Sequence, residues 1–224
     1  NGKWGLINMN NETIVPFRYA GFKGSFTEEK KYITSEGFIM VQNFNHKMGI
    51  LNIDGDIILD FKYDDIDEIY IPKPGEVYII TSKRYSIAGT LMELHFIDMS
   101  PDYNMIIGSK TLIPESAHFS LVRRITSDIY AAQGDIGAGL YDDDGRCLTE
   151  KLAKRLGSNI HRFIGIKMSP YIMLQSSIFG PDNGGWGLYK VNNKELDVET
   201  IIPAKFKHAE ILGNSSLIKI GTSD

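Results

Sequence analysis

The chain has little cysteine, no long apolar run and no excess of charge of one sign. Its single cysteine, Cys147, cannot form an internal disulfide, and the compartment stays open because many secreted proteins also lack disulfides. No apolar segment approaches the roughly 20 residues that cross a bilayer, so membrane insertion is not expected. With 24 basic and 28 acidic residues, the chain offers no overall field to a polyanion, and nucleic acid is not an expected partner.

The length sets the number of domains. A chain of 224 residues can bury a sizeable core as one unit, so we expect a single domain over residues 1–224. The sequence starts at Asn1 with a repeat already under way, which indicates either a removed leader or a segment of a longer protein. Neither the localisation nor the oligomeric state follows from the sequence.

A repeated segment organises the whole sequence. Residues 3–19, KWGLINMNNETIVPFRY, align with residues 47–63, KMGILNIDGDIILDFKY. The same pattern recurs to give five units, whose shared apolar positions are 44, 46, 44 and 48 residues apart. These positions are occupied by Trp4, Met48, Leu94, Ala138 and Trp186. A glycine follows in four units, at Gly5, Gly49, Gly139 and Gly187, and His95 stands there in the third.

Each unit predicts four short strands separated by turns rich in Asn, Asp and Gly. The fourth strands are nearly continuous apolar runs, at residues 38–43, 77–82, 128–134, 171–177 and 216–221. Continuous apolar runs are typical of strands buried on both faces, so we expect these to be the innermost strands. About four strands in a repeat of about 45 residues is the spacing of a propeller blade.

The two ends of the sequence complement each other. The chain begins at a first strand and ends at a fourth strand, so residues 216–221 can pair beside residues 3–8 and close the array into a ring. The predicted fold is therefore all-β, a five-bladed β-propeller closed by its N- and C-terminal strands. An open array of stacked β-hairpins is the alternative.

The repeat resembles a known family. Its units, best seen in GKWGLINMNNETIVPFRY and HKMGILNIDGDIILDFKYDDIDEI, look like the WG repeat, also called the KWG repeat, a short β-rich bacterial repeat. The resemblance covers essentially the whole chain and is weakest in the third unit. It implies a bacterial repeat scaffold that binds another molecule, in a family that supplies no catalytic motif and no settled ligand.

The Trp-Gly pair is interpreted as a packing feature. An exposed Trp could stack on a sugar or a peptide, but Met48, Leu94 and Ala138 occupy the same position and offer no such platform. A glycine lets a large ring or another backbone approach closely. The residues of this structural signature are Trp4, Gly5, Gly49, Gly139, Trp186 and Gly187.

Metal and cofactor sites are not expected. The acidic segments NIDGD (52–56) and DDDG (142–145) resemble parts of calcium loops, but both fall at hairpin turns and lack the Glu that completes such a loop. His118, His161 and His208 recur at similar distances in their units without a register that brings them together. One segment departs from the β pattern: residues 149–157 predict a short amphipathic helix with Thr149 as N-cap and Gly157 as its stop.

The predicted function is binding. Polar residues end the fourth strands, and in a ring they would surround the axis and contact a polar ligand; they are Gln42, Thr81, Gln133, Gln175 and Lys219. Glycoside hydrolysis needs two carboxylates at the axis, and the inner strands carry only Asp128 at one mouth, so we predict no catalytic residues. The prediction is a non-catalytic scaffold for a protein, peptide or glycan. A divergent glycan-active propeller enzyme and a structural spacer are the alternatives.

Overall fold

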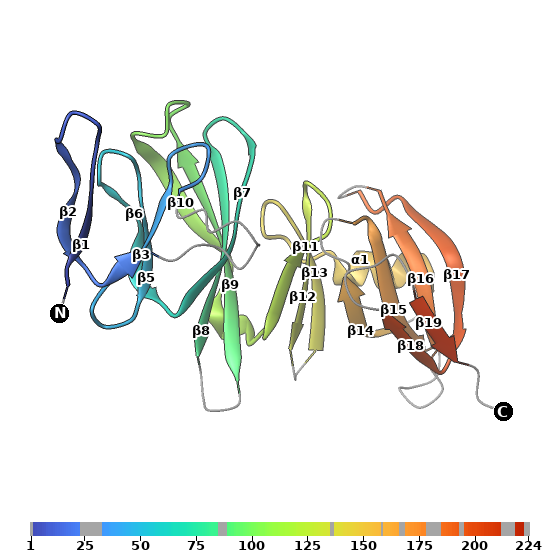
Figure 1. The fold of residues 1–224 in the computed structure, drawn as a ribbon. Helices are drawn as coiled ribbons and strands as arrows, with labels where there is room; N and C mark the ends of the chain where they lie inside the picture. Colours follow the sequence, from blue (N-terminus) through green and yellow to red (C-terminus); the bar gives the residue numbers. More distant parts are fainter. Residues whose placement is uncertain are drawn as a thin grey trace. The chain divides into compact units, whose positions relative to one another are not determined.

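The computed structural model describes residues 2–22, 33–84, 89–134, 137–157, 159–165, 169–177, 185–192, 195–211 and 218–221 (Figure 1). The chain divides into two compact units, Asn1–Glu115 and Ser116–Asp224. Each unit is described by itself below. That residues 1–224 act as one domain stays a prediction.

Within its described residues, the first unit contains three antiparallel sheets, β1-β2, β3-β4-β5-β6 and β7-β8-β9-β10, each of strands in chain order. A short 3₁₀ turn, Glu115–Ala117, follows the last strand. The strands are β1 (Trp4–Ile7), β2 (Thr13–Tyr19), β3 (Gly21–Phe22), β4 (Ile39–Gln42), β5 (Met48–Leu51), β6 (Ile57–Tyr63), β7 (Asp65–Lys73), β8 (Glu76–Arg84), β9 (Thr90–Met99) and β10 (Ile106–Ile113).

The second unit also contains three antiparallel sheets, β11-β12-β13, β14-β15-β16-β17 and β18-β19. Its elements are β11 (Leu121–Arg124), β12 (Ile129–Gly134), β13 (Gly137–Asp142), α1 (Thr149–Leu156), β14 (Asn159–Gly165), β15 (Tyr171–Ser177), β16 (Gly185–Val191), β17 (Val198–Phe206), β18 (His208–Ile211) and β19 (Ile218–Gly221). The expectation of an all-β chain is confirmed.

The sheets do not coincide with the sequence repeats. Each four-stranded sheet joins the third and fourth strands of one unit of sequence to the first and second strands of the next, as β3-β4 join β5-β6. The fourth strands β4, β8 and β15 therefore have a neighbour on each side, and so does β12. The expectation that they are innermost is wrong, because a strand between two others cannot form the inner edge of a blade. Their continuous apolar runs reflect a central place in the sheet, with both faces covered.

The recurring glycine lies opposite a bulge. In β1-β2, Trp4 pairs with Tyr19 and Leu6 with Val15, so Gly5 alone faces three residues, 16–18. Gly49 and Gly187 face residues 60–62 and 203–205 in the same way. A Cβ atom on Gly5 would lie 2.5 Å from the Val15 carbonyl oxygen, and one on Gly49 would lie 2.9 Å from that of Leu59. Glycine is required because the bulged backbone occupies the space of a side chain.

Strand register moves the repeat position of the third unit. Leu94 pairs with Ile113 as Leu6 pairs with Val15, and both partners precede a proline. The residue equivalent to Trp4 is therefore Met92, not Leu94, and Glu93 rather than His95 stands at the glycine position. The extension of β9 and β10 concealed this register in the sequence.

Four turns in the described part of the chain are built in the same way. The side-chain Oδ1 atom of Asn8 accepts hydrogen bonds from the backbone N–H groups of residues 10 and 12. Asn43, Asn52 and Asp142 repeat this pair of bonds in their own turns. The fourth residue of each turn has a positive φ: Asn11, His46, Gly55 and Gly145. The acidic segments 52–56 and 142–145 are thus built as turns.

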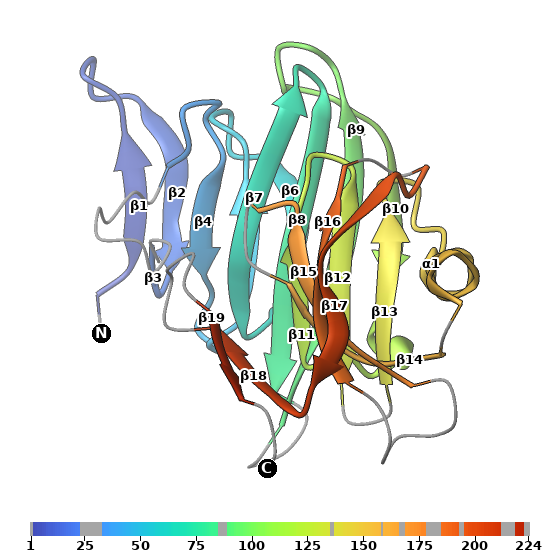
Figure 2. The ribbon, with the colours of Figure 1, turned by 90° about the vertical axis from the view of Figure 1, so that its right-hand side faces the viewer.

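A helix takes the place of one predicted strand. In the fourth unit of sequence, the second strand is replaced by α1, which lies alongside β13 (Figure 2). Thr149 is the first helical residue and not the N-cap; its Oγ1 atom accepts a hydrogen bond from the Leu140 N–H of β13. Leu152 is fully buried in the core of the second unit, and Gly157 ends the helix in a left-handed conformation. Within the described residues, no helix is long and apolar enough to cross a membrane.

The cores lie between successive sheets of a unit. Val15 and Tyr19 of the first sheet pack against Ile39, Val41 and Leu51 of the second. The opposite face of that second sheet contributes Met48 and Ile50 to a larger core with the third sheet. The sheet β3-β4-β5-β6 is thus covered on both faces by the other two sheets of its unit.

Candidate ligand-binding groove

A groove of about 380 Å³ lies between the second and third sheets of the first unit. It is lined by β6 on one side and by β9 and β10 on the other. Buried Ile58, Leu59, Tyr63, His95 and Ile97 form its floor, together with the partly exposed Phe96. Its exposed rim consists of Ile57, Asp60, Lys62, Ile106, Ser109, Lys110 and Thr111. Its volume lies in the range of small-ligand sites.

His95 links the groove to a buried polar cluster. Its Nε2 atom is 3.1 Å from the Thr81 hydroxyl, and its Nδ1 atom is 3.2 Å from the hydroxyl of Thr111 on the rim. Burial, with the charges of Lys62 and Lys83, lowers the pKa of His95 to about 4. His95 is therefore neutral at pH 7 and donates one hydrogen bond while accepting the other.

Glu93 stands at the glycine position of the third unit and contacts the bulged backbone through its side chain. Its Oε1 atom accepts a hydrogen bond from the backbone N–H of Glu115, which follows the proline at the bulge position. Its buried Oε2 atom is 3.7 Å from the Lys83 Nζ atom and makes no hydrogen bond. Lys83 also pairs with Glu115. In the third unit, the Glu93 side chain thus holds the backbone after Ile113 by a hydrogen bond. In three of the units with a glycine, the two backbones pack directly against each other at this position.

Tyr63, the last residue of β6, packs against this cluster. Its ring meets the His95 ring at a centroid distance of 5.3 Å in an edge-on arrangement. The Nζ atoms of Lys62 and Lys83 lie 5.2 and 5.5 Å from the centre of the Tyr63 ring. Burial and the negative charge of Glu93 raise the pKa of the Tyr63 hydroxyl, which stays protonated.

The rim combines cationic, hydroxyl and apolar groups. Of the residues described, none forms an ion pair with Lys62 or a hydrogen bond with the Ser109 hydroxyl. Ile57 and Ile106 expose 47 and 40 % of their surfaces. The groove can therefore donate hydrogen bonds to an anionic group and cover an apolar one.

The five residues predicted to bind a ligand do not all occupy equivalent positions in their sheets. Gln42, Gln133 and Gln175 are equivalent, because each pairs with the residue at the Trp position of its sheet: Met48, Ala138 and Trp186. All three are partly exposed, and the Gln42 side chain bonds weakly to the His46 carbonyl oxygen. None of the five predicted residues lines the groove.

Thr81 and Lys219 are not equivalent to the glutamines. Thr81 is fully buried and pairs with Glu93, whereas Ser82 pairs with Met92 at the position of Gln42. In β19, Gly221 pairs with His208 as Gln42 pairs with Gly21, so Lys219 lies two residues away. A match of local sequence could not detect these shifts.

The two tryptophans differ in exposure. Trp186 is 8 % exposed and packs in a small apolar gap against Ala209 and Ile220 of the next sheet. Trp4 is 58 % exposed in the two-stranded sheet β1-β2, and Ile7 and Phe17 of this sheet are 53 and 54 % exposed. Their equivalents Met48 and Leu51 in the next sheet are fully buried. The Trp position is thus a packing position where a neighbouring sheet covers it.

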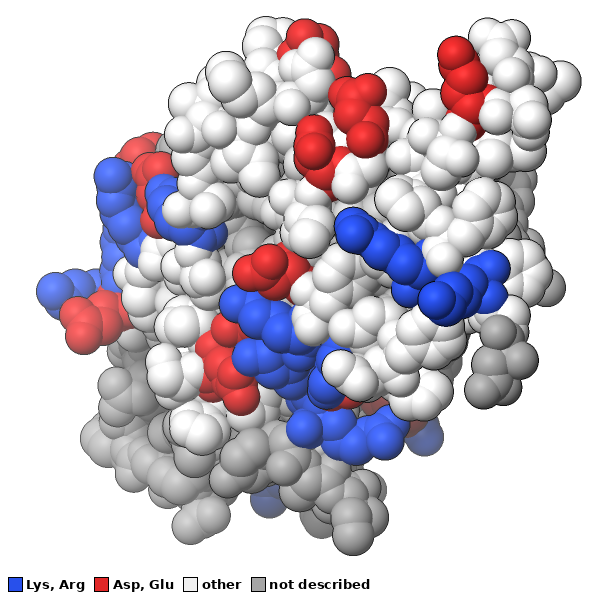
Figure 3. All heavy atoms as spheres, turned by 90° about the vertical axis from the view of Figure 1, so that its left-hand side faces the viewer, with Lys and Arg blue, Asp and Glu red and all other residues white. Residues whose placement is uncertain are grey.

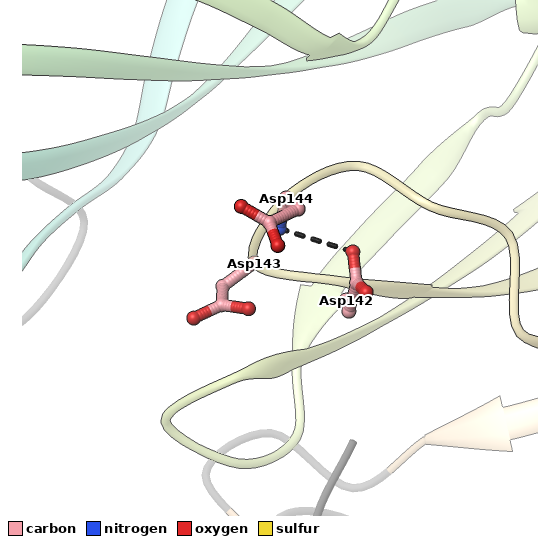
Figure 4. A group of neighbouring side chains, drawn as sticks. All are labelled: Asp142, Asp143 and Asp144. Carbon is pink, nitrogen blue, oxygen red and sulfur yellow. Dashed lines mark hydrogen bonds between the residues drawn. The ribbon is translucent and has the colours of Figure 1, made fainter. Parts of the chain in front are cut away.

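Three consecutive carboxylates lie at the turn after β13 (Figure 4). Asp142 is 3 % exposed, and its Oδ1 atom accepts hydrogen bonds from the backbone N–H groups of Asp144 and Arg146. Arg146 also lies 3.2 Å from Asp144. This arrangement serves the turn and its arginine.

On the face drawn in Figure 3, basic and acidic side chains lie in small groups, several of which adjoin one another, and uncharged surface covers the rest of the described part. No protein-family model, curated protein or solved structure matches this chain.

Sequence reasoning missed the groove because its residues come from two units of sequence. The signal that could have found it was a set of polar residues in strands that are otherwise apolar: Lys83 after the fourth strand of the second unit, and Glu93 and His95 in the first strand of the third. His95 was interpreted as a departure from the repeat, and Glu93 and Lys83 were not singled out. The three residues belong to a connected cluster beside the groove.

Proposed function

We propose that this chain is a non-catalytic, WG-type repeat scaffold that binds a protein, peptide or glycan, and that the groove between β6 and β9-β10 is its binding site. The observation that supports the proposal is the meeting of Lys62, Ser109 and Thr111 with an apolar floor in one groove of about 380 Å³.

The lining of the groove favours binding over glycoside hydrolysis. That reaction uses a pair of carboxylates about 5–10 Å apart, and Asp60 is the one carboxylate among the lining residues. His95 has both ring nitrogens engaged and its pKa is held at about 4, so it is poorly suited to act as a general base near neutral pH.

The test is a binding screen with a variant that fills the groove. The protein is probed against an oligosaccharide array and a display library of random decapeptides. Ser109→Trp places a large ring at the exposed rim, and Ser120→Trp, at an exposed position after the groove-bearing sheet, is the matched control. We expect ligands that bind the native chain and the control but not Ser109→Trp.

Equal binding by Ser109→Trp would show that the groove is not the site. Absence of any ligand in either screen would contradict the binding function. Mass spectrometry of the array after incubation would detect cleaved oligosaccharides, which would favour the glycan-active enzyme instead.

We also propose that the array closes into a five-bladed ring. Each four-stranded sheet combines the third and fourth strands of one sequence unit with the first and second strands of the next. The two-stranded sheet β18-β19 is a pair of third and fourth strands, and β1-β2 is a pair of first and second strands, so together they would make a further sheet of the same kind. Three large apolar side chains of β1-β2 are exposed, those of Trp4, Ile7 and Phe17. A closed ring would place a further sheet next to β1-β2 and cover them. In such a sheet β19 would pair with β1.

A disulfide tests the closure. Met48-Gln42 and Ile50-Met40 are cross-strand pairs, and the equivalent pairs at the junction are Trp4-Gly221 and Leu6-Lys219. In a background with Cys147→Ser, the change Leu6→Cys with Lys219→Cys should oxidise rapidly within one chain, because directly opposed residues meet the distance a disulfide needs. Leu6→Cys with Ile218→Cys is the control, since a one-residue shift turns the side chain to the other face. Equal, slow oxidation of both pairs would favour the open array.

A further inference from the structure

The two walls of the groove end in strands with a free edge. β6 has β5 as its one neighbour in its sheet, and β10 has β9, within the residues that the structure describes. Consecutive residues of β6 between Ile57 and Tyr63 line the groove. Because consecutive side chains of a strand point to opposite faces of the sheet, the groove runs along the edge of β6 and is not confined to one face. Free strand edges offer unpaired backbone N–H and C=O groups to a further strand.

The two edges differ in regularity. β6 carries the bulge at residues 60–62, which disrupts the spacing of its backbone groups. β10 pairs with β9 without a register shift from Gly108 to Thr111. Most of β10 is exposed, including Ser109, Lys110 and Thr111. The regular edge of β10 is the better template for an added strand.

Side chains around this edge define the chemistry of the added strand. Lys62 and Lys110 both lie on the rim, and Asp60 is the one acidic lining residue, so the groove carries a net positive charge. The field of Lys62 also disfavours a proton on His95. Exposed Ile57 and Ile106 add an apolar surface. An amphipathic anion complements both features.

We propose that an extended peptide segment adds to the free edge of β10, with an acidic side chain near Lys62 and Lys110 and an apolar side chain on Ile57 and Ile106. This rests on the proposed binding function and names its ligand class. A strand is favoured over a sugar because backbone pairing uses the β10 edge, and the one aromatic ring on the floor that is partly exposed, Phe96, has the Lys110 Nζ atom 5.7 Å from its centre.

The random decapeptide library provides the test. We expect selected peptides to share an acidic residue and an apolar residue separated by one position, because alternate side chains of a strand share a face. Lys62→Glu should weaken the best peptide by about tenfold or more, the size expected for a lost charged hydrogen bond. Lys154→Glu, an exposed lysine of α1, makes the same charge change elsewhere and should leave the affinity unchanged.

Backbone pairing is tested on the peptide itself. N-methylation of alternate residues blocks the donors on one edge of the peptide, so one of the two methylation registers should abolish binding and the other should not. Amide exchange at residues 108–111 should slow in the complex. Equal binding of both methylated peptides, or equal affinity of Lys62→Glu, would overturn the inference.

The two proposals can fail separately. Oligosaccharide binding that is lost in Ser109→Trp, without any peptide binding, would preserve the groove as a binding site and overturn the peptide as its ligand. Absence of binding in both screens would overturn the two together.

Discussion

Replacing Gly49 with alanine tests the physical basis of the repeat. The added methyl group would lie 2.9 Å from the Leu59 carbonyl oxygen and 2.9 Å from the Phe61 ring. The backbone there cannot retreat easily, because Met48 and Ile50 on either side are fully buried. Overpacking of this kind costs about 1–3 kcal/mol. For a chain of this size, ~2 kcal/mol corresponds to a melting temperature roughly 4–8 °C lower.

The matched control is Gly21→Ala. Gly21 also lies in a strand of the same sheet, but a Cβ atom there would meet nothing within 4 Å. The change should be neutral or slightly stabilising, because alanine restricts the unfolded chain. Thermal unfolding followed by circular dichroism compares the two variants, and amide exchange in β5 and β6 locates the effect. Equal melting temperatures would refute the explanation of the glycine by the bulge.

Three further outcomes are expected. His95 has a folded-state pKa of about 4, below its unfolded value of about 6.5, so the unfolded chain gains the proton first as the pH falls between these values. The unfolding free energy of the native chain should therefore fall by up to about 3 kcal/mol over this pH range, and that of His95→Gln should not. The same pH dependence in both proteins, measured by urea denaturation, would contradict this. Asp142→Ala removes the acceptor of two backbone N–H groups and should cost about 1–2 kcal/mol of unfolding free energy. Asp144→Ala should cost little, because the exposed ion pair of Asp144 with Arg146 contributes little. Similar changes in melting temperature for the two variants would refute the role of Asp142 in holding the turn. Leu152→Ala should cost about 2–5 kcal/mol, because the Leu152 side chain is fully buried in the core of the second unit. Leu156→Ala, one turn later in α1, should cost less because Leu156 is only partly buried against that core, and equal costs in chemical denaturation would contradict the described docking of α1.

The elements of the repeat were predictable because their causes are local. Alternating apolar residues, Asn and Asp at turns, and glycine after the Trp position all act within a few residues. The fourth strands β4, β8, β12, β15 and β19 accordingly occur at the segments where they were expected. The helix at residues 149–156 was likewise evident from its apolar spacing and Gly157. Thr149 was assigned as the cap because its hydrogen bond with the Leu140 N–H of the preceding strand, β13, depends on how the helix packs against that strand.

The candidate site was less predictable, since pairing partners decide it. Local matching assigned Thr81 to the position of Gln42 and Leu94 to that of Trp4, and cross-strand pairing shifts these to Ser82 and Met92. The groove requires β6 and β10 to face each other although 42 residues, 64–105, lie between Tyr63 and Ile106. Nothing within either segment specifies the other as its neighbour.

The sequence by itself determined the all-β class, the repeat, the turns and the short helix, because each follows from backbone preferences and from which side chains avoid water. Only the tertiary structure decided that sheets straddle the repeats, that Gly49 lies beneath a bulge, and that Glu93 and His95 connect to Lys83 and Thr111 around a groove. These features depend on which strands pair and in what register. Distant segments can pair with the same strand edge, and the free energy of the whole sheet decides which of them does.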